Sequence, residues 1–250
     1  MPFVLSFRHS LYLFVRQIPC CQGLLGKIVC AKKWMDQRMS LRIMRTNGLA
    51  ACERIFQALR AKGIRHWADH GTMLGIIREN GLIAHDLDVD YSVPHEVDLA
   101  DVYKALSKCG FVLLRGFAYH GEVVEITLSW KGVSVDFFKC HPIGAQMGHF
   151  VFVPRLNETT WEVVDVMAHE RVRPYVIGPV EKSFGPNNNT HAYIPKNVEE
   201  LLTLSYGNWR VPDSKTDFSK RDIPTQYRDV YEGCSFLSTE ELLKKFGCLR

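Results

Sequence analysis

Three aspartates stand at alternate positions in the middle of the chain, at Asp86, Asp88 and Asp90. Alternate side chains of a β-strand share one face, so this spacing predicts a row of carboxylates. Like charges placed this close repel one another unless a cation or a proton relieves them. Because carboxylate oxygens suit a hard divalent ion, the row indicates a site for Mg²⁺ or Mn²⁺ and metal-dependent phosphoryl transfer.

A further carboxylate is expected to join two of these acids. Asp88 and Asp90 alternate with apolar and aromatic residues, and Asp136 lies inside the largely apolar run 133–139. If the two predicted strands are neighbours in one sheet, the three carboxylates converge, as two-metal phosphoryl transfer requires for ions about 4 Å apart. The spacing therefore predicts these three residues as metal ligands and catalytic residues. Asp86 is left with a supporting role or with capping a turn.

A predicted turn before the acids offers a place for phosphate. Gly71 and Thr72 precede a predicted short helix at 73–78, and backbone N–H groups at such a position bind anions. Arg78 offers the same donor phosphate a bidentate contact. His85, beside the acids, fits a phosphate contact or a proton shuttle. It equally fits a turn histidine without a catalytic part.

Periodicity, caps and turn residues indicate which elements position these side chains. Helices are predicted at 40–62, 73–78, 98–109, 195–206 and 239–246. Strands are predicted at 64–68, 86–92, 111–114, 122–130 and 133–139. Residues 141–173 are mixed, with 161–170 of uncertain type; 174–186 is rich in loops, and the tail after 212 is irregular up to the last helix. This order points to an α+β fold with a small mixed β-sheet flanked by helices.

Composition narrows the classes of partner. The chain has 250 residues, 46% of them hydrophobic and 23% charged, and a net charge of +4. Mild basicity suits an anionic substrate, but no basic stripe interleaved with aromatics is present, so nucleic acid is not expected as a partner. Eight cysteines, none in a C-x-x-C pair, are expected to be free thiols, with a disulfide or two in an oxidising compartment as the alternative.

The first 39 residues are expected to form an N-terminal extension. Two apolar runs, 3–18 and 23–31, are interrupted by charged residues, so neither resembles a spanning helix or a signal peptide. A basic amphipathic anchor with peripheral membrane association and an extension packing on the domain both fit. Two triplets, at 157–159 and 188–190, match the glycosylation pattern and favour the secretory pathway slightly over the cytoplasm.

Several motifs together carry a resemblance to a known family. The chain resembles the LicD/fukutin family, whose core is similar to the nucleotidyltransferases of the DNA polymerase β superfamily, over 64–212. The residues that carry the resemblance are Trp67, Asp69, Gly71-Thr72-Met73-Leu74-Gly75, Arg78, Leu82-Ile83, Asp86, Asp88-Val89-Asp90, Asp136, Ile194-Pro195, Asn197, Leu201, Ser205-Tyr206-Gly207, Trp209 and Pro212. The resemblance implies a nucleotidyltransferase-like domain at 40–212 and a C-terminal tail, 213–250, packing on it.

The resemblance also implies an activity. Members of the family move a phospho-alcohol, of phosphocholine or phosphoribitol type, from a CDP-linked donor to a glycan or sugar hydroxyl. In this chain Asp88 and Asp90 would then hold Mg²⁺ or Mn²⁺, and Asp136 would complete the site and accept the proton of the acceptor hydroxyl. Tyr206 and Trp209 match the closing motif and would line an acceptor pocket, although aromatic residues near a helix end also serve as packing.

Two other functions remain open at this point. One is a nucleotidyltransferase that attaches a nucleoside monophosphate to a small molecule or protein. The other is a degenerate member that binds a glycan or a partner without turnover. Retention of three mutually repelling acids speaks for an active site.

Overall fold

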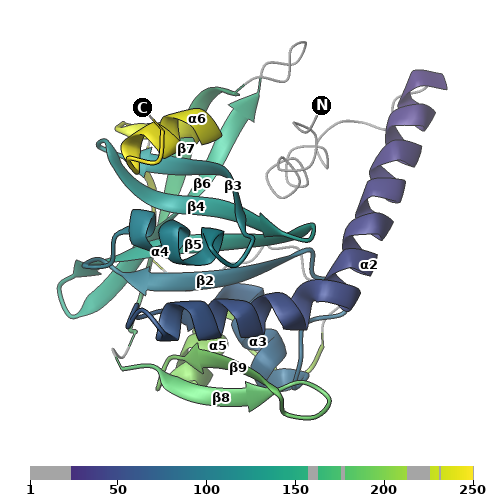
Figure 1. Cartoon of the computed structure of the whole chain (residues 1–250), viewed down its shortest axis with the longest axis vertical. Helices are drawn as coiled ribbons and strands as arrows, with labels where there is room; N and C mark the ends of the chain where they lie inside the picture. Colours follow the sequence, from purple (N-terminus) through teal and green to yellow (C-terminus); the bar gives the residue numbers. More distant parts are fainter. Residues whose placement is uncertain (1–23, 157–162, 176–177, 213–225, 231, 250) are drawn as a thin grey trace.

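A mixed nine-stranded sheet organises the molecule, as Figure 1 shows. The computed structural model describes residues 24–156, 163–175, 178–212, 226–230 and 232–249. The sheet consists of β1 (Trp67–Ala68), β2 (Asp88–Pro94), β3 (Val112–Tyr119), β4 (Glu122–Trp130), β5 (Val133–Ile143), β6 (Gln146–Leu156), β7 (Val163–Arg173), β10 (Gln226–Val230) and β11 (Cys234–Ser238). A separate hairpin pairs β8 (Val180–Phe184) with β9 (Thr190–Ile194). The described helices are α2 (Leu24–Arg60), α3 (His70–Arg78), α4 (Leu99–Ser107), α5 (Val198–Tyr206) and α6 (Thr239–Lys245).

The strand order brings distant parts of the chain together. Along the main path the strands run β10-β7-β6-β5-β4-β3-β11, and β2 lies beside β5 with β1 at its other edge. The β2–β5 pair is parallel, whereas the others are antiparallel. Helices and strands of both orientations in one unit confirm the predicted α+β class with a mixed sheet.

Alternation along β2 and β5 separates a hydrophobic face from a polar one. Val89, Tyr91 and Phe137 are fully buried in the main core, together with side chains of α2, α4 and α6. Residues of the opposite parity, including Asp90 and Asp136, therefore lie on the other face of the sheet. A second cluster joins α3 and α5 to that side of the molecule, with the buried residues Trp67, Met73, Leu74, Cys140, Met147, Tyr175, Leu201, Leu202 and Trp209.

Two boundaries near the acids differ from the sequence-based prediction. Helix α3 begins at His70, because Asp69 caps its first turn through a bond from the His70 N–H; Gly71 and Thr72 thus lie inside the helix and not in a preceding turn. Strand β2 begins only at Asp88. Asp86 lies in the preceding turn, where its N–H donates to the Ile83 carbonyl, so the expected row of three acids on one strand is wrong for Asp86.

Other elements are longer than the sequence indicated. Strands β6 and β7 form a long hairpin in the interval 141–173, for which the sequence pattern predicts mixed structure. The pattern predicts none of β8, β9, β10 and β11. Several predicted segments match closely: β4 covers 122–130, α4 covers most of 98–109, and α6 covers most of 239–246. Of the cysteines, Cys52, Cys109, Cys140, Cys234 and Cys248 are free thiols.

Helix α2 passes through the boundary expected at residue 39. Its C-terminal part packs against α4, β2, β5 and β9, while its N-terminal part, purple in Figure 1, extends away from the sheet. In the part of the chain that the structure describes, no helix is both long and apolar enough to cross a membrane.

Candidate active site

Three carboxylates converge on the polar face of β2 and β5. Asp90 is the register partner of Asp136 across the parallel pair, and Asp88 precedes Asp90 by two residues on the same face. One oxygen from each of these three residues lies within 4.8 Å of the others. The structure thus brings together the three acids predicted from the sequence. Strands β2 and β5, which carry these acids, are neighbours in the sheet, although β3 and β4 lie between them in the sequence.

The carboxylates repel one another in the absence of a cation. Burial, and then the charges of Asp88 and Asp136, raise the pKa of Asp90 well above its ordinary value. A site that raises a pKa in this way favours a bound proton or a metal ion. Because every ligand is a carboxylate oxygen, the donor set fits Mg²⁺ or Mn²⁺.

Two threonines fix the geometry of this cluster. The Thr127 hydroxyl donates a 2.5 Å hydrogen bond to Oδ1 of Asp136 from the neighbouring strand β4. Thr72 is buried in the first turn of α3, and its Oγ1 accepts a 2.8 Å bond from the Asp90 backbone N–H. Outer hydrogen bonds of this kind orient the ligands of a metal site. The predicted Thr72 therefore acts on β2 through its hydroxyl, in addition to the phosphate role expected of its N–H.

The start of α3 also lies against Asp86. A Cβ at Gly71 would overlap the Asp86 carboxylate, so only glycine permits this close approach. The first amides of a helix have no partner within the helix and favour negative charge. Asp86 therefore lies against the start of α3, and the supporting role expected of it stays a prediction.

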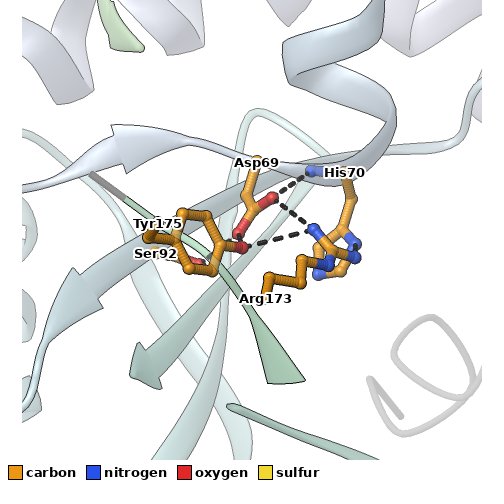
Figure 2. Close-up of polar contacts among 5 residues, drawn as sticks. All are labelled: Asp69, His70, Ser92, Arg173 and Tyr175. Carbon is orange, nitrogen blue, oxygen red and sulfur yellow. Dashed lines mark hydrogen bonds and ion pairs between the residues drawn. The ribbon is translucent and has the colours of Figure 1, made fainter. Parts of the chain in front are cut away.

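A buried ion pair holds the start of α3 in place (Figure 2). Arg173, at the end of β7, donates through Nη1 to Oδ1 of Asp69 at 3.0 Å, and both side chains are almost completely buried. Tyr175 and Ser92 donate to the other carboxylate oxygen. Burial opposes ionisation of Asp69, but the charges of His70 and Arg173 hold its pKa well below the usual range. Three segments of the chain, 69–70, β2 and 173–175, thus meet at one ionised carboxylate.

The other predicted residues lie around this centre at different distances from it. Arg78 is at the far end of α3, where it donates to the Trp209 carbonyl at 3.2 Å and to Glu79 at 2.7 Å. Its contact with donor phosphate stays a prediction. His85 is exposed in the turn before Asp86, and its role also stays a prediction.

The two aromatic residues of the closing motif differ in their surroundings. Trp209 is 5% exposed and packs in the second cluster. For Tyr206, burial raises the pKa of the hydroxyl, Arg173 opposes this, and the charges of Asp90 and Asp86 add to the rise. The acceptor-pocket role of both residues remains a prediction.

Sequence reasoning missed the Asp69 network as part of the site. Asp69 was visible within the first motif, and its position two residues before a Gly-Thr pair is a signal for a helix cap. Arg173 lies 104 positions away, and nothing in its local sequence marks it. His149 was also missed: it is fully buried beside His70, at a ring distance of 5.0 Å, and burial lowers its pKa well below the ordinary value.

A comparison with protein families finds a match over the part of the chain that contains the three carboxylates. Residues 63–175, which include β1, α3, the three carboxylates and Arg173, match the family model described as LicD/FKTN/FKRP, nucleotidyltransferase domain. The chain carries a LicD-family nucleotidyltransferase domain. The resemblance inferred from the motifs is thereby confirmed. Membership supports a transferase of the phosphotransferase type in general terms.

Other comparisons add little to the LicD assignment. A search of curated protein sequences finds no match. Among solved structures, one is titled "Crystal Structure of ANT(2")-Ia in complex with adenylyl-2"-tobramycin", with 12% identity and a TM-score of 0.33 over 40% of this chain. The match covers 54% of the length of that protein, so this chain spans about half of it.

Proposed function

We propose that the LicD domain is a metal-dependent transferase that moves a phospho-alcohol from a CDP-linked donor to a glycan or sugar hydroxyl. The observation that carries the proposal is the convergence of Asp88, Asp90 and Asp136, with ligand oxygens within 4.8 Å of one another. Mg²⁺ or Mn²⁺ held there would neutralise the donor phosphates and the charge that develops during transfer. Membership of the LicD family supports the donor and acceptor classes.

The residues of this chain supply position and charge. The acceptor oxygen attacks the phosphorus that carries the alcohol, the bond from that phosphorus to the oxygen of CMP breaks, and CMP leaves. Asp136 is the proposed acceptor of the hydroxyl proton, and the bond from Thr127 to its Oδ1 orients the carboxylate for that task. Gly71 and Thr72 are proposed to bind donor phosphate through their N–H groups. Catalysis is then mainly orientation and electrostatic stabilisation.

A screen of CDP-linked alcohols tests the proposal. Purified protein is incubated with Mn²⁺ or Mg²⁺, a glycan mixture and one donor at a time, and CMP release is measured. We expect one donor class to release CMP in a metal-dependent manner, and the double variant Asp88→Asn, Asp90→Asn to release none. Wild-type turnover in that double variant, with the fold intact, would contradict the mechanism.

Nucleotidyl transfer remains the second enzymatic candidate, because the matched domain is described as a nucleotidyltransferase domain. A donor labelled in the base or in the alcohol separates the two reactions by the half that reaches the product. Calorimetry with Mn²⁺ and CDP separates both from a non-catalytic member, for which neither would bind.

A further inference from the structure

The part of α2 that extends away from the sheet presents two exposed methionines side by side. Met35 and Met39 are one helical turn apart and therefore share one side of the helix, and each is 58% exposed. Ser40 and Met44, on the opposite side of the helix, are buried. This stretch of α2 thus has one side against the rest of the molecule and one apolar ridge, Met35 with Met39, that faces solvent.

Arginines surround the apolar ridge. Arg42 is exposed on the same side of the helix as Met35 and Met39, and Arg38 and Arg45 are exposed beside it. Arg42 and Arg45 form no ion pair with any residue that the structure describes. Their positive charge is therefore open to a partner from outside the molecule.

The sequence concentrates positive charge in this part of the chain. Residues 24–45 contain six Lys or Arg and one acidic residue, whereas the whole chain has a net charge of only +4. A basic helix with exposed apolar side chains is typical of a segment that lies in the interface of a membrane. Anionic headgroups complement its charge. A soluble anion would match the arginines but would leave the methionines exposed.

The same helix passes the edge of the sheet at which β2 and β5 begin. Arg45 donates to the Ala84 carbonyl at 3.4 Å, in the segment that leads to β2. Asn47 donates to the Lys131 carbonyl at 3.0 Å, in the turn before β5. Beyond these contacts the N-terminal part of α2 projects from the molecule (Figure 1). The projecting part therefore starts beside the ends of the two strands that carry the three acids.

We propose that residues 35–45 of α2 bind the surface of a membrane that contains anionic lipids. Met35 and Met39 enter the boundary between headgroups and acyl chains, and Arg42 and Arg45 contact the headgroup phosphates and carboxylates. The edge of the sheet beside the acidic cluster is then turned toward the bilayer. The inference goes beyond the proposed transfer reaction and does not depend on it, because it concerns binding alone.

Sedimentation of the full chain with lipid vesicles tests the proposal. Vesicles of phosphatidylcholine alone are compared with vesicles in which about a third of the lipid is phosphatidylserine. We expect wild type to sediment with the anionic vesicles only. Sodium chloride at about 0.5 M should release it, since salt screens the attraction between the arginines and the headgroups.

Two double variants separate the contributions of charge and apolar surface. Arg42→Gln with Arg45→Gln, and Met35→Gln with Met39→Gln, should each lower the partition constant by about tenfold or more. Arg42→Lys with Arg45→Lys keeps the charge and should bind as wild type does. Unchanged melting temperatures show that the variants are folded.

A control on β8 removes the same kinds of side chain from another surface. Val180 and Lys182 are both exposed, and Val180→Gln with Lys182→Gln should bind the anionic vesicles as wild type does. Loss of binding in this control as well would mean that the attraction is not specific to α2 and would overturn the proposal.

Other outcomes would also overturn it. These are equal binding to neutral and anionic vesicles, no binding to either, and unchanged binding by both double variants with glutamine. Sedimentation equilibrium without lipid tests a different occupant of the ridge. A wild-type dimer that Met35→Gln with Met39→Gln makes monomeric, without vesicle binding, would assign the ridge to a second copy of this chain. Because CMP release is not measured, none of these results bears on the proposed transfer reaction.

Discussion

At the residue scale, Asp90 is proposed as a metal ligand, and its carboxylate destabilises the folded protein when no metal is bound. Burial and the charges of the neighbouring acids both raise the pKa of its carboxyl group. Its side chain therefore stabilises the protein only when a proton or a cation accompanies it. The same property makes it the best single position at which to test whether the cluster exists for a metal.

We predict opposite effects of Asp90→Asn on activity and on metal-free stability. Metal-dependent CMP release should fall by about 100-fold or more, because a metal ligand is lost. In EDTA, the free energy of unfolding should rise by about 1 kcal/mol, since carboxylate repulsion is removed. Because the pKa of Asp90 is raised in the folded state, the free energy of unfolding of wild type falls as pH rises above about 4. The difference in this free energy between the variant and wild type should therefore widen with pH.

Urea unfolding between pH 4 and 8 measures this difference. A variant less stable than wild type at every pH would contradict the repulsion.

His66 gives the protein a second pH dependence, of opposite sign. Its Nδ1 lies 2.9 Å from the Ile64 carbonyl oxygen, and burial lowers its pKa from 6.5 to about 4. The unfolded chain takes up a proton at higher pH than the folded one, so the free energy of unfolding should fall by about 3 kcal/mol as pH drops from 6.5 to 4.

The variant His66→Phe tests this assignment. It keeps an aromatic ring beside Tyr193, whose ring centre lies 5.4 Å away, but has no proton to gain. Its stability should therefore change less than that of wild type across the same pH window in urea unfolding. An unchanged slope would assign the pH dependence to another group.

At the element scale, the position of α3 depends on a pair of charges far apart in sequence. Asp69 caps the helix, and Arg173 reaches it from β7. Removing one partner of a buried pair leaves the other charge uncompensated, which is more damaging than removing both. The helix that carries Thr72, and through it the strand that carries Asp90, therefore depends on a contact outside the predicted motif.

We predict that Arg173→Met lowers the free energy of unfolding by about 3 to 5 kcal/mol. The double variant Asp69→Asn, Arg173→Met should recover part of that loss, because no buried charge remains. The exposed pair of Arg155 with Asp165 supplies the control: Arg155→Met should cost about 1 kcal/mol or less. Chemical denaturation of wild type, Asp69→Asn, Arg173→Met and the double variant gives the coupling energy, and strictly additive losses would mean that the pair does not act as a unit.

The sequence predicted which side chains share one face of a strand better than it predicted which strands are neighbours in the sheet. Asp88 and Asp90 could be placed on one face because Val89 and Tyr91 between them demand burial. Their meeting with Asp136 depended on β2 pairing with β5 instead of with the strand that follows it in sequence, which no local pattern specifies. The hairpin of β6 and β7 escaped prediction because β6 contains Pro154 and lacks clean alternation.

At the scale of the whole molecule, stability and ion binding should be linked. An ion that binds only the folded state stabilises it in proportion to the logarithm of its concentration. The acidic cluster spans two strands that are neighbours in the centre of the sheet, so relief of repulsion there strengthens the unit to which α2, α4 and α6 are attached. The melting temperature of the chain thus reports on the site.

We predict that Mn²⁺ at about 100 times its Kd raises the melting temperature of wild type by roughly 5 to 10 °C, and that EDTA reverses the rise. The double variant Asp88→Asn, Asp90→Asn should show no response. Scanning calorimetry measures both proteins under the same ionic strength. An equal rise in the double variant would place the ion elsewhere.

The buried pair of Asp69 with Arg173 has a consequence for how far the domain can be shortened. All three carboxylates of the cluster lie before residue 137, but a fragment that ended before β7 would leave the Asp69 charge buried without Arg173 and without the Tyr175 hydroxyl. Such a fragment would carry every proposed metal ligand and would lose the anchor of the helix that holds Thr72. The smallest active fragment is therefore set by the support of α3, and not by the position of the acids along the chain.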